Sequence, residues 1–313
     1  MHVLFALMPI LAACGGSSNA PIDGSVGGDG TPGDAMLPDI GGGPLDELRF
    51  AVVGDTRPAA PNDTANYPTA IITKIWQDVE AEVPHPRFAI STGDYMFADT
   101  NTNEQQPQLA KYMGARAAFT GLQYPAMGNH ECTGATASNC GQGAHDGITK
   151  NMADFIQTML KPLGVTLPYY ERQFAATDGT WTAKLVVVAC NAWNATQATW
   201  LASALTPATT YTFVVRHEEV SVMSTTPCAQ SQTIIGQHPL TLLIVGHTHT
   251  YRHYASDREI IVGNGGAPLT TGMNYGYVVV SRNANGTLTV TARDYLTNAV
   301  LDTFSIQASG AGA

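Results

Sequence analysis

The chain has 313 residues, enough for one large domain or two smaller ones, and 44% of them are hydrophobic, which allows a sizeable buried core. Its formal net charge is −10, and its 15 Lys and Arg residues form no basic run. The composition therefore excludes a basic platform for nucleic acid and argues against electrostatic attraction to anionic membranes.

The chain begins with an apolar stretch over residues 3–13 that is too short to span a bilayer and fits the hydrophobic region of a signal peptide. It ends in LAAC, at 11–14, which resembles the bacterial lipobox, a signal in which the cysteine is lipidated. This resemblance implies export to the bacterial cell envelope, periplasmic or surface-exposed, with a lipid anchor at Cys14 as the only membrane contact. An ordinary secretory signal with an incidental cysteine is the alternative.

The expected organisation is a lipoprotein-type signal peptide over 1–13, a Gly-rich tether over 14–46, a folded domain over 47–306 and a flexible tail over 307–313. The tether is too poor in apolar residues to form a core, and its Gly, Ser, Asp and Pro residues are typical of a disordered chain. We expect it to hold the folded domain away from the membrane as a flexible coil.

The folded region repeats one pattern, in which a β-branched apolar run stops at a glycine or at a residue type that binds metals. Five such runs predict strands followed by polar loops, over 48–55, 87–94, 123–131, 212–219 and 241–249. Apolar residues at helical spacing predict helices over about 66–83, 109–116, 152–160 and 196–205, the last with Thr196 as its N-cap.

This alternation predicts an α/β fold with βαβ crossovers and a largely parallel sheet, and sites in such sheets lie beyond the carboxyl ends of the strands. All five polar clusters are expected at that edge. Two alternating segments within 256–306, YVVVSRN and TLTVTARD, predict antiparallel strands of a second sheet.

The residues at the five strand ends are Asp, Asn and His, which are oxygen and nitrogen donors suited to a pair of metal ions. Two cations about 3.5–4 Å apart can clamp the oxygens of a phosphoryl group and lower the pKa of a bound water. The residues at these strand ends are Asp55, Asp94, Asn129 with His130 and Glu131, His217, and His247 with His249.

Apart from Cys14, the chain has four cysteines, which allow three pairings. Cys132 and Cys140 lie eight residues apart in a loop rich in Gly, Ser and Asn, so they are the expected local pair, which leaves Cys190 and Cys228 for a second disulfide. Four free thiols are the alternative, which an oxidising compartment disfavours.

Taken in order, the motifs resemble the calcineurin-like metallophosphoesterase superfamily over about residues 48–306. They are GD at 54–55, GD at 93–94, GNHE at 128–131, an isolated His217 and GHTH at 246–249. GDYMFAD, GHTHTYRH and IIVGNGGAP resemble motifs of its purple acid phosphatase branch. The resemblance implies a four-layer αββα fold, in which a two-sheet β-sandwich is flanked by helices.

The resemblance also implies an activity: hydrolysis of small phosphate esters, first of all monoesters, by a metal-bound hydroxide, with Fe, Zn or Mn in two sites. Asp94 would bridge the two ions. The remaining ligands divide between the sites, with Asn129, His217 and His247 at the second site and Asp55 and His249 at the first.

Two catalytic roles follow from the same resemblance. His130 would contact the substrate and protonate the leaving group, and Glu131 would orient His130, as carboxylates beside metal sites do. A phosphodiesterase or nucleotidase is the alternative within the same fold. A non-catalytic surface-binding protein with a degraded first site is a further alternative, but the complete second site and His130 favour an enzyme.

The chain departs from the superfamily in the first metal site. Most members have Asp-x-His in the first motif, but the position of that histidine is Arg57 here, and a charged guanidinium cannot ligate a metal. The purple acid phosphatases supply a tyrosine in GD-x-x-Y instead, and that position is Phe97 here. The first site, which keeps only Asp55, Asp94 and His249, is therefore expected to be completed by water, weak or empty. Arg57 would either bind a phosphate oxygen or pair with an acid near the pocket.

Overall fold

The computed structural model of the protein describes residues 42–308. The predicted signal peptide, the lipidation site Cys14 and the predicted tether up to residue 41 lie outside the described residues, as does the tail beyond residue 308. Within 42–308, no helix has both the length and the apolar character that crossing a bilayer requires.

One sheet has six strands in the order β13-β12-β11-β2-β3-β4. Its parallel half is formed by β2 (Arg49–Val53), β3 (Phe88–Ser91) and β4 (Leu122–Pro125), and its antiparallel half by β11 (Gly276–Arg282), β12 (Leu288–Asp294) and β13 (Val300–Ile306). The antiparallel strands predicted within 256–306 therefore extend the sheet of β2 and do not form a second sheet. The physical reason is burial: β11 is buried over most of its length, so its backbone needs a paired strand on both sides.

The other sheet has seven strands in the order β1-β5-β6-β7-β8-β10-β9. They are β1 (Gly43–Leu45), β5 (Tyr170–Ala176), β6 (Thr182–Val187), β7 (Tyr211–Val215), β8 (Leu242–Val245), β9 (Tyr251–Tyr254) and β10 (Glu259–Val262). Strands β6, β7, β8 and β10 run parallel, whereas β5 and β9 are antiparallel to β6 and β10. Strands β5 and β6 are absent from the sequence-based prediction, because the buried Arg172 and Lys184 interrupt their apolar pattern.

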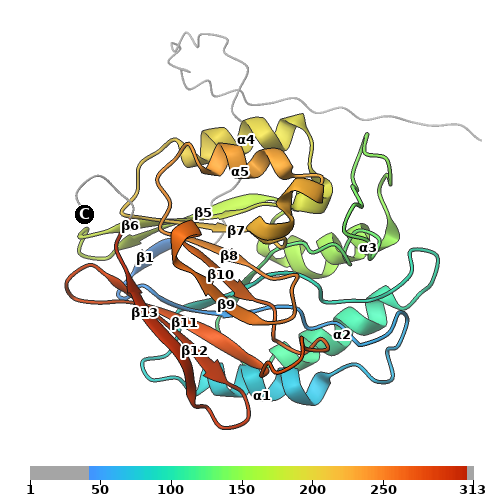
Figure 1. Cartoon of the computed structure of the whole chain (residues 1–313), viewed down its shortest axis with the longest axis horizontal. Coiled ribbons are helices and arrows are strands. Elements are labelled where there is room, and N and C mark those ends of the chain that lie inside the picture. Colours follow the sequence, from blue (N-terminus) through green and yellow to red (C-terminus); the bar gives the residue numbers. More distant parts are fainter. Residues whose placement is uncertain (1–41, 309–313) are drawn as a thin grey trace, which may run out of the picture. The chain divides into compact units, whose positions relative to one another are not determined.

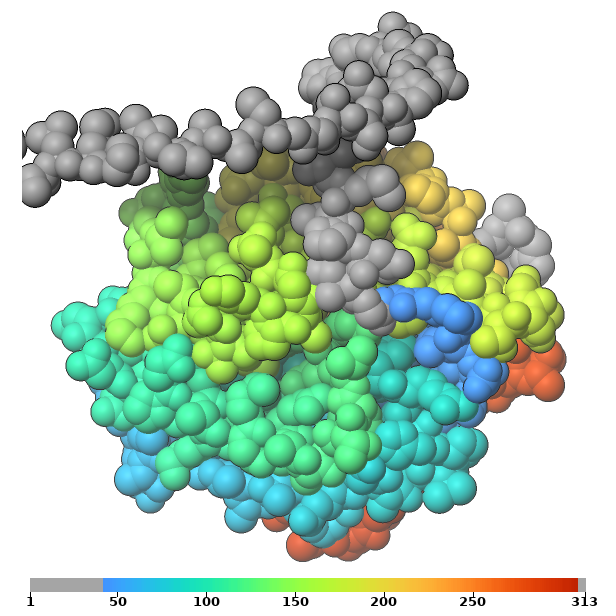
Figure 2. All heavy atoms as spheres, turned by 180° about the vertical axis from the view of Figure 1, so that it is seen from behind, coloured from blue at the N-terminus to red at the C-terminus, as the bar shows by residue number. Residues whose placement is uncertain are grey.

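The ordered domain begins before residue 47, where the sequence patterns place its start. Gly43–Leu45 form β1, which pairs in parallel with β5 over residues 174–176; Figure 2 shows this blue segment beside the yellow-green one. Backbone pairing holds this part of the predicted tether, and Leu45 is its one side chain packed against the main core, so its composition gives little sign of the pairing.

Helices cover the outer faces of both sheets (Figure 1). The six-stranded sheet carries α1 (Thr69–Glu80) and α2 (Gln105–Arg116), and the seven-stranded sheet carries α4 (Ala195–Leu205) and α5 (Ala229–Ile235). Helix α3 (Lys150–Phe155) continues as a π-helical turn and a 3₁₀ turn, and the short turns span Ile156–Leu160, Lys161–Leu163, Cys190–Ala192, Val220–Thr225 and Ala255–Asp257. The four-layer α/β fold expected from the resemblance is thus confirmed.

The four predicted helices correspond to α1–α4, with shifted ends. The N-cap of α4 is Asn194 and not Thr196, because Asn194 is extended and its side chain accepts a hydrogen bond from the Gln197 N–H (2.8 Å). Helix α5 is absent from the sequence-based prediction, since its seven residues are too few for a helical pattern to be recognised.

Aromatic rings fill the space between the two sheets. Phe50 and Phe88 of the six-stranded sheet stack with centroids 5.1 Å apart, and Phe174 of the seven-stranded sheet stacks on Phe88 at 4.7 Å. Phe213 meets Phe50 edge-on at 5.0 Å. A second apolar cluster lies between the seven-stranded sheet and helices α4 and α5. Burial on both faces fixes the register of the central strands, and with it the position of the polar loops at their ends.

Candidate metal centre

The polar loops at the carboxyl ends of five strands meet at one place. Three of these strands, β2, β3 and β4, belong to the six-stranded sheet, and β7 and β8 belong to the seven-stranded sheet. The candidate site therefore lies where the two sheets meet, rather than along the edge of one largely parallel sheet. All the predicted site residues come together there, namely Asp55, Arg57, Asp94, Asn129, His130, Glu131, His217, His247 and His249.

The backbone at the centre is strained in a consistent way. Asp55, Asp94 and His247 have φ values of 56°, 57° and 70°, in the left-handed region that residues other than glycine seldom adopt. The Asp55 N–H donates to the Gly93 carbonyl (3.1 Å), which links the loops after β2 and β3. A Cβ atom on Gly128 would collide with Asp94 Oδ1, so the loop after β4 can approach this carboxylate only with glycine there.

Four ligand atoms of the predicted second site converge on one point. Asn129 Oδ1 lies 3.0 Å from His217 Nε2 and 3.1 Å from His247 Nδ1. The two imidazole nitrogens are 3.3 Å apart, and Asp94 Oδ1 lies 3.3 Å from His217 Nε2. Atoms that share one ion at about 2.0–2.2 Å are separated by about 3.0–3.5 Å, so these spacings fit a single metal ion.

The protonation of His217 also fits a metal ligand. Its Nδ1 lies 2.8 Å from the Thr92 carbonyl oxygen, and because a carbonyl only accepts, Nδ1 is assigned a proton and Nε2 is the nitrogen that faces the centre. Burial lowers the pKa of His217, but attraction to the carboxylates of Asp94 and Asp55 outweighs it and raises that pKa well above the ordinary value. The surroundings thus favour positive charge at this point. Without a metal that charge is a proton on Nε2, and a cation held by the same atoms would take the place of the proton.

The predicted first site is assembled differently. His249 Nε2 lies 3.7 Å from Asp55 Oδ1, and His249 Nδ1 lies 2.7 Å from the Pro268 carbonyl oxygen, so Nε2 carries the lone pair. Burial raises the pKa of Asp55 well above its usual value, although both its carboxylate oxygens accept from the His247 N–H (3.2 and 3.1 Å). The guanidinium of Arg57 lies on this side of the centre.

Asp94 lies between the two halves, as a bridging carboxylate would. Its Oδ1 faces His217, and its Oδ2 lies 3.7 Å from both Arg57 Nε and His130 Nε2. Burial raises the pKa of Asp94, but attraction to His217, His130 and Arg57 outweighs it and holds that pKa well below the ordinary value. Asp94 is therefore an ionised ligand candidate at the middle of the centre.

His130 contacts the centre without joining the converging ligand atoms. Its N–H donates to Asp94 Oδ1 (3.2 Å), and its ring meets the Phe97 ring edge-on with centroids 4.4 Å apart. His130 Nδ1 is buried and has no hydrogen-bond partner among the described residues. Burial lowers the pKa of His130 to about 4, against the attraction of Asp94. The imidazole is therefore neutral near pH 7 when no anion lies beside it.

Glu131 has contacts other than those expected of it. Its Oε2 accepts from the backbone N–H groups of Asp94 and Gly128 (2.8 Å each), and its Oε1 accepts from the Tyr95 N–H (2.8 Å). These bonds join the loops after β3 and β4, so Glu131 holds Asp94 in place rather than orienting the His130 ring. Burial raises the pKa of Glu131 to about 7.

Several supporting groups have no counterpart in the sequence-based prediction. The carbonyls of Thr92 and Pro268 fix two histidine rings, and a backbone carbonyl gives no signal in a sequence. Glu219, which the sequence leaves open as either a supporting group beside His217 or a solvated acid, accepts a hydrogen bond from the Thr248 hydroxyl (2.7 Å) and so supports the GHTH loop. Tyr95, near the position of the missing tyrosine ligand, points elsewhere, because its hydroxyl donates to the Ser91 and Ala126 carbonyls.

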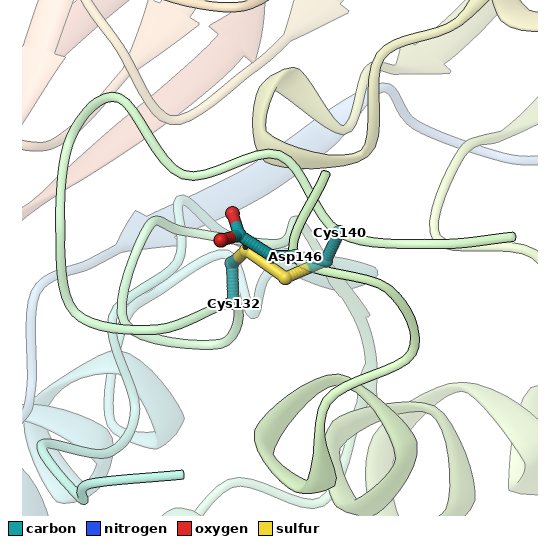
Figure 3. Close-up of side chains that lie close together, drawn as sticks. All are labelled: Cys132, Cys140 and Asp146. Atoms are coloured by element: carbon teal, nitrogen blue, oxygen red, sulfur yellow. Dashed lines mark hydrogen bonds between the residues drawn. A yellow bond between two sulfur atoms is a disulfide. The ribbon is translucent and has the colours of Figure 1, made fainter. Parts of the chain in front are cut away.

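The two cysteine pairs lie at disulfide distance, in the predicted connectivity. The sulfurs of Cys132 and Cys140 are 1.95 Å apart, and those of Cys190 and Cys228 are 1.98 Å apart. Asp146 lies beside the first pair (Figure 3), but sulfurs bonded to each other are not available to a metal. The first pair closes the loop that directly follows the GNHE motif.

Comparisons with known proteins bear on the fold. No protein-family model and no curated protein matches the chain. Among solved structures, it is similar to purple acid phosphatase PPD1 from seeds of yellow lupin (Lupinus luteus), with a TM-score of 0.53 at 14% identity, over 83% of this chain and 54% of that one. It is also similar to GAP50, the anchor in the inner membrane complex of Plasmodium, with a TM-score of 0.55 at 12% identity, over 86% and 91%.

The chain spans about half of the length of the lupin phosphatase, at 54%. The two similar structures also differ in what they are described as, since one is a phosphatase and the other an anchor. At such low identity the similarity establishes the architecture and leaves the activity to be argued from the site. The chain shares its architecture with these two structures, one of them a purple acid phosphatase, the branch whose motifs its sequence resembles.

Proposed function

We propose that the protein is a metal-dependent phosphoesterase that hydrolyses small phosphate esters, first of all monoesters. The observation that carries this proposal is the convergence of ligand atoms from Asn129, His217 and His247 beside the Asp94 carboxylate, at 3.0–3.3 Å from one another. A metal ion bound there supplies charge to balance the phosphate and lowers the pKa of a water molecule. A mixed set of imidazole nitrogens and oxygens suits Fe, Zn or Mn.

The substrate would approach from the side on which the centre is least buried. Arg57, His247 and His249 are partly exposed, whereas Asp55, Asp94 and His217 are buried. The guanidinium of Arg57 is thus available to an anion from solvent, and guanidinium groups bind phosphate through paired N–H donors.

His130 is our candidate for the group that protonates the departing alcohol. It lies on the Arg57 side of Asp94, and its ring is held by Phe97. Its pKa of about 4 without substrate means that it lacks the required proton near pH 7. A phosphate anion beside it would favour the charged imidazolium, so we expect His130 to be protonated together with substrate binding.

Two other functions remain in view. A phosphodiesterase or nucleotidase would use the same ligand atoms and differ only in the alcohol bound. A non-catalytic binding protein is favoured by one observation, the similarity to a structure described as an anchor. The complete set of second-site ligands argues for an enzyme, because a binding surface gains nothing from four converging metal-ligand atoms.

An activity assay with controlled metal loading separates these functions. The full-length protein would be stripped with a chelator, reloaded with Mn²⁺, Zn²⁺ or Fe, and assayed on p-nitrophenyl phosphate, bis(p-nitrophenyl) phosphate and a nucleoside 5′-monophosphate. We expect metal-dependent hydrolysis with preference for the p-nitrophenyl monoester. Preference for the diester or the nucleotide would select an alternative enzyme, and a metal-loaded protein without activity on any ester would select the binding protein.

We also propose that the protein is exported and anchored by lipid at Cys14, which lies outside the described residues. Two cysteine pairs at disulfide distance support an oxidising compartment. Wild-type protein should partition with membranes when expressed in a bacterium, and Cys14→Ser should not. Soluble behaviour of both would leave the ordinary secretory signal as the explanation.

A further inference from the structure

We propose that the guanidinium of Arg57 takes the place of the first metal ion, so that the protein holds a single ion, at the second site. This inference rests on the metal-binding role proposed above and goes beyond it, because it fixes the number of ions and names what fills the other half of the centre. It builds on both roles predicted for Arg57, since the side chain faces the acid Asp94 and keeps N–H donors for a phosphate oxygen.

The two oxygens of the Asp94 carboxylate face different neighbours. A carboxylate that bridges two ions offers one oxygen to each. Asp94 Oδ1 faces the second site through His217, and its other oxygen, Oδ2, lies 3.7 Å from Arg57 Nε. The oxygen that would bind the first ion therefore already faces a positive charge.

Both ring nitrogens of His249 already have neighbours. Its Nδ1 is held by the Pro268 carbonyl, so Nε2 is the only nitrogen that could bind a metal. Arg57 Nη2 lies 3.4 Å from His249 Nε2 with its N–H directed at this nitrogen. A lone pair that accepts a hydrogen bond is not free for a metal. Of the three remaining first-site ligands, His249 is thus hydrogen-bonded to the guanidinium, and Asp94 faces the same charge at 3.7 Å.

The guanidinium of Arg57 lies over the ring of Phe97. The guanidinium carbon lies 4.7 Å from the centroid of the Phe97 ring, a cation–π arrangement. Arg57 and Phe97 stand at the two positions where the superfamily and its purple branch place metal ligands, a histidine and a tyrosine. The two residues that replace the metal ligands thus contact each other. Their contact holds the Arg57 guanidinium in the first half of the centre, where it does not coordinate a metal.

Contacts on several sides fix the position of the guanidinium. Besides Asp94, His249 and Phe97, it contacts the Pro58 carbonyl, to which Arg57 Nη1 donates (3.0 Å). A guanidinium has five N–H donors, so hydrogens on Nη1 and Nη2 remain for a phosphate oxygen. Its side chain is 14% exposed, which leaves these donors within reach of a ligand. The arrangement supplies a fixed single charge where a two-metal enzyme has a divalent or trivalent ion.

Counting bound metal tests this inference. The full-length protein, stripped and reloaded with Mn²⁺ and then dialysed, should contain one ion per chain by elemental analysis. Arg57→His restores a ligand and removes the cation, so it should contain two. Arg87→His is the matched control, because it makes the same exchange on an exposed arginine at the opposite end of β3, and it should contain one.

Electron paramagnetic resonance gives a second measurement on the same samples. Wild type should show the six-line signal of an isolated Mn²⁺ ion, and Arg57→His should show the broadened signal of two coupled ions. Two ions in wild type would overturn the inference without any variant. A folded Arg57→His that still holds one ion would also overturn it, since the guanidinium would then not be what excludes the second.

The outcome is independent of the activity assay. A protein with one ion and no hydrolysis of any ester would disprove the proposed enzyme and leave the inference intact. A protein that hydrolyses esters and holds two ions would do the reverse.

Discussion

The two halves of the centre share Asp94 and differ in what faces its two oxygens. On the side of His217 and His247, the neighbouring atoms are nitrogens and an oxygen able to bind a metal, at 3.0–3.3 Å from one another, the spacing that a common ion imposes. On the side of His249, the neighbouring atoms are the N–H groups of Arg57. The raised pKa of His217 means that a proton balances the second half, and a metal ion can displace this proton, whereas the guanidinium of Arg57 cannot give up its charge.

The comparison shows that a list of ligand types is not yet a metal site. Asp55, Asp94 and His249 are all present and close together, yet one arginine changes what they can bind. The second half has no such competitor among the described residues, and the buried carboxylates favour positive charge at His217. The number of ions thus depends on the donors nearby as much as on the ligands.

The largest loss of metal affinity and activity is expected when a ligand of the second half of the centre is removed. His217→Ala removes one of four converging ligands, and because even the loss of an outer partner of a ligand costs about 10–100-fold in metal affinity, we expect a larger loss and no measurable hydrolysis. Metal content after dialysis checks this, with His238→Ala, outside the centre, as the control. Full metal loading of His217→Ala would contradict the assignment of this half.

The next largest effect is expected on turnover when His130, which belongs to neither half of the centre, is replaced. His130→Ala should keep its metal and lose about 10²–10⁴-fold in turnover, the usual contribution of a positioned general acid. A leaving group that needs no proton, such as p-nitrophenolate, should be affected less than an alkyl alcohol. Loss of metal in this variant would instead make His130 a ligand.

Glu131 supports both halves of the centre, because it accepts hydrogen bonds from the backbone around Asp94. Glu131→Ala leaves at least three buried backbone N–H groups of Asp94, Tyr95 and Gly128 without their acceptor. Each costs about 1–3 kcal/mol, so the free energy of unfolding should fall by about 3 kcal/mol or more. Chemical denaturation measures this, and Glu131→Gln, which keeps one acceptor oxygen, should fall less. Unchanged stability with altered kinetics alone would favour the role of orienting His130.

The smallest effect is expected in the first half. His249→Ala should leave one ion per chain, because the guanidinium and not a metal is its neighbour, and turnover should fall by no more than about tenfold, the loss of a weak hydrogen bond to Arg57. Elemental analysis and steady-state kinetics of the same preparation check both statements. A fall in metal content comparable to that of His217→Ala would erase the difference between the halves.

The sequence by itself determined the residues of the centre and the class of fold. Asp55, Asp94, Asn129, His217 and His247 each follow a short, largely apolar run, and such a run can be recognised from consecutive residues. The cysteine pairs were also predictable, because a separation of eight residues favours a local pair and leaves the other two.

Only the tertiary structure decided how these parts meet. Strand β11 joins β2 across more than two hundred residues, β1 pairs with β5 across more than one hundred, and neither pairing leaves a local pattern. The contacts of Arg57 with Phe97 and His249 join side chains 40 and 192 positions apart, and those of Glu131 reach backbone groups up to 37 positions away. Periodicity records which face of an element is buried, but not which distant side chain it meets, so the ligand types follow from the sequence and the occupant of the first half follows only from the fold.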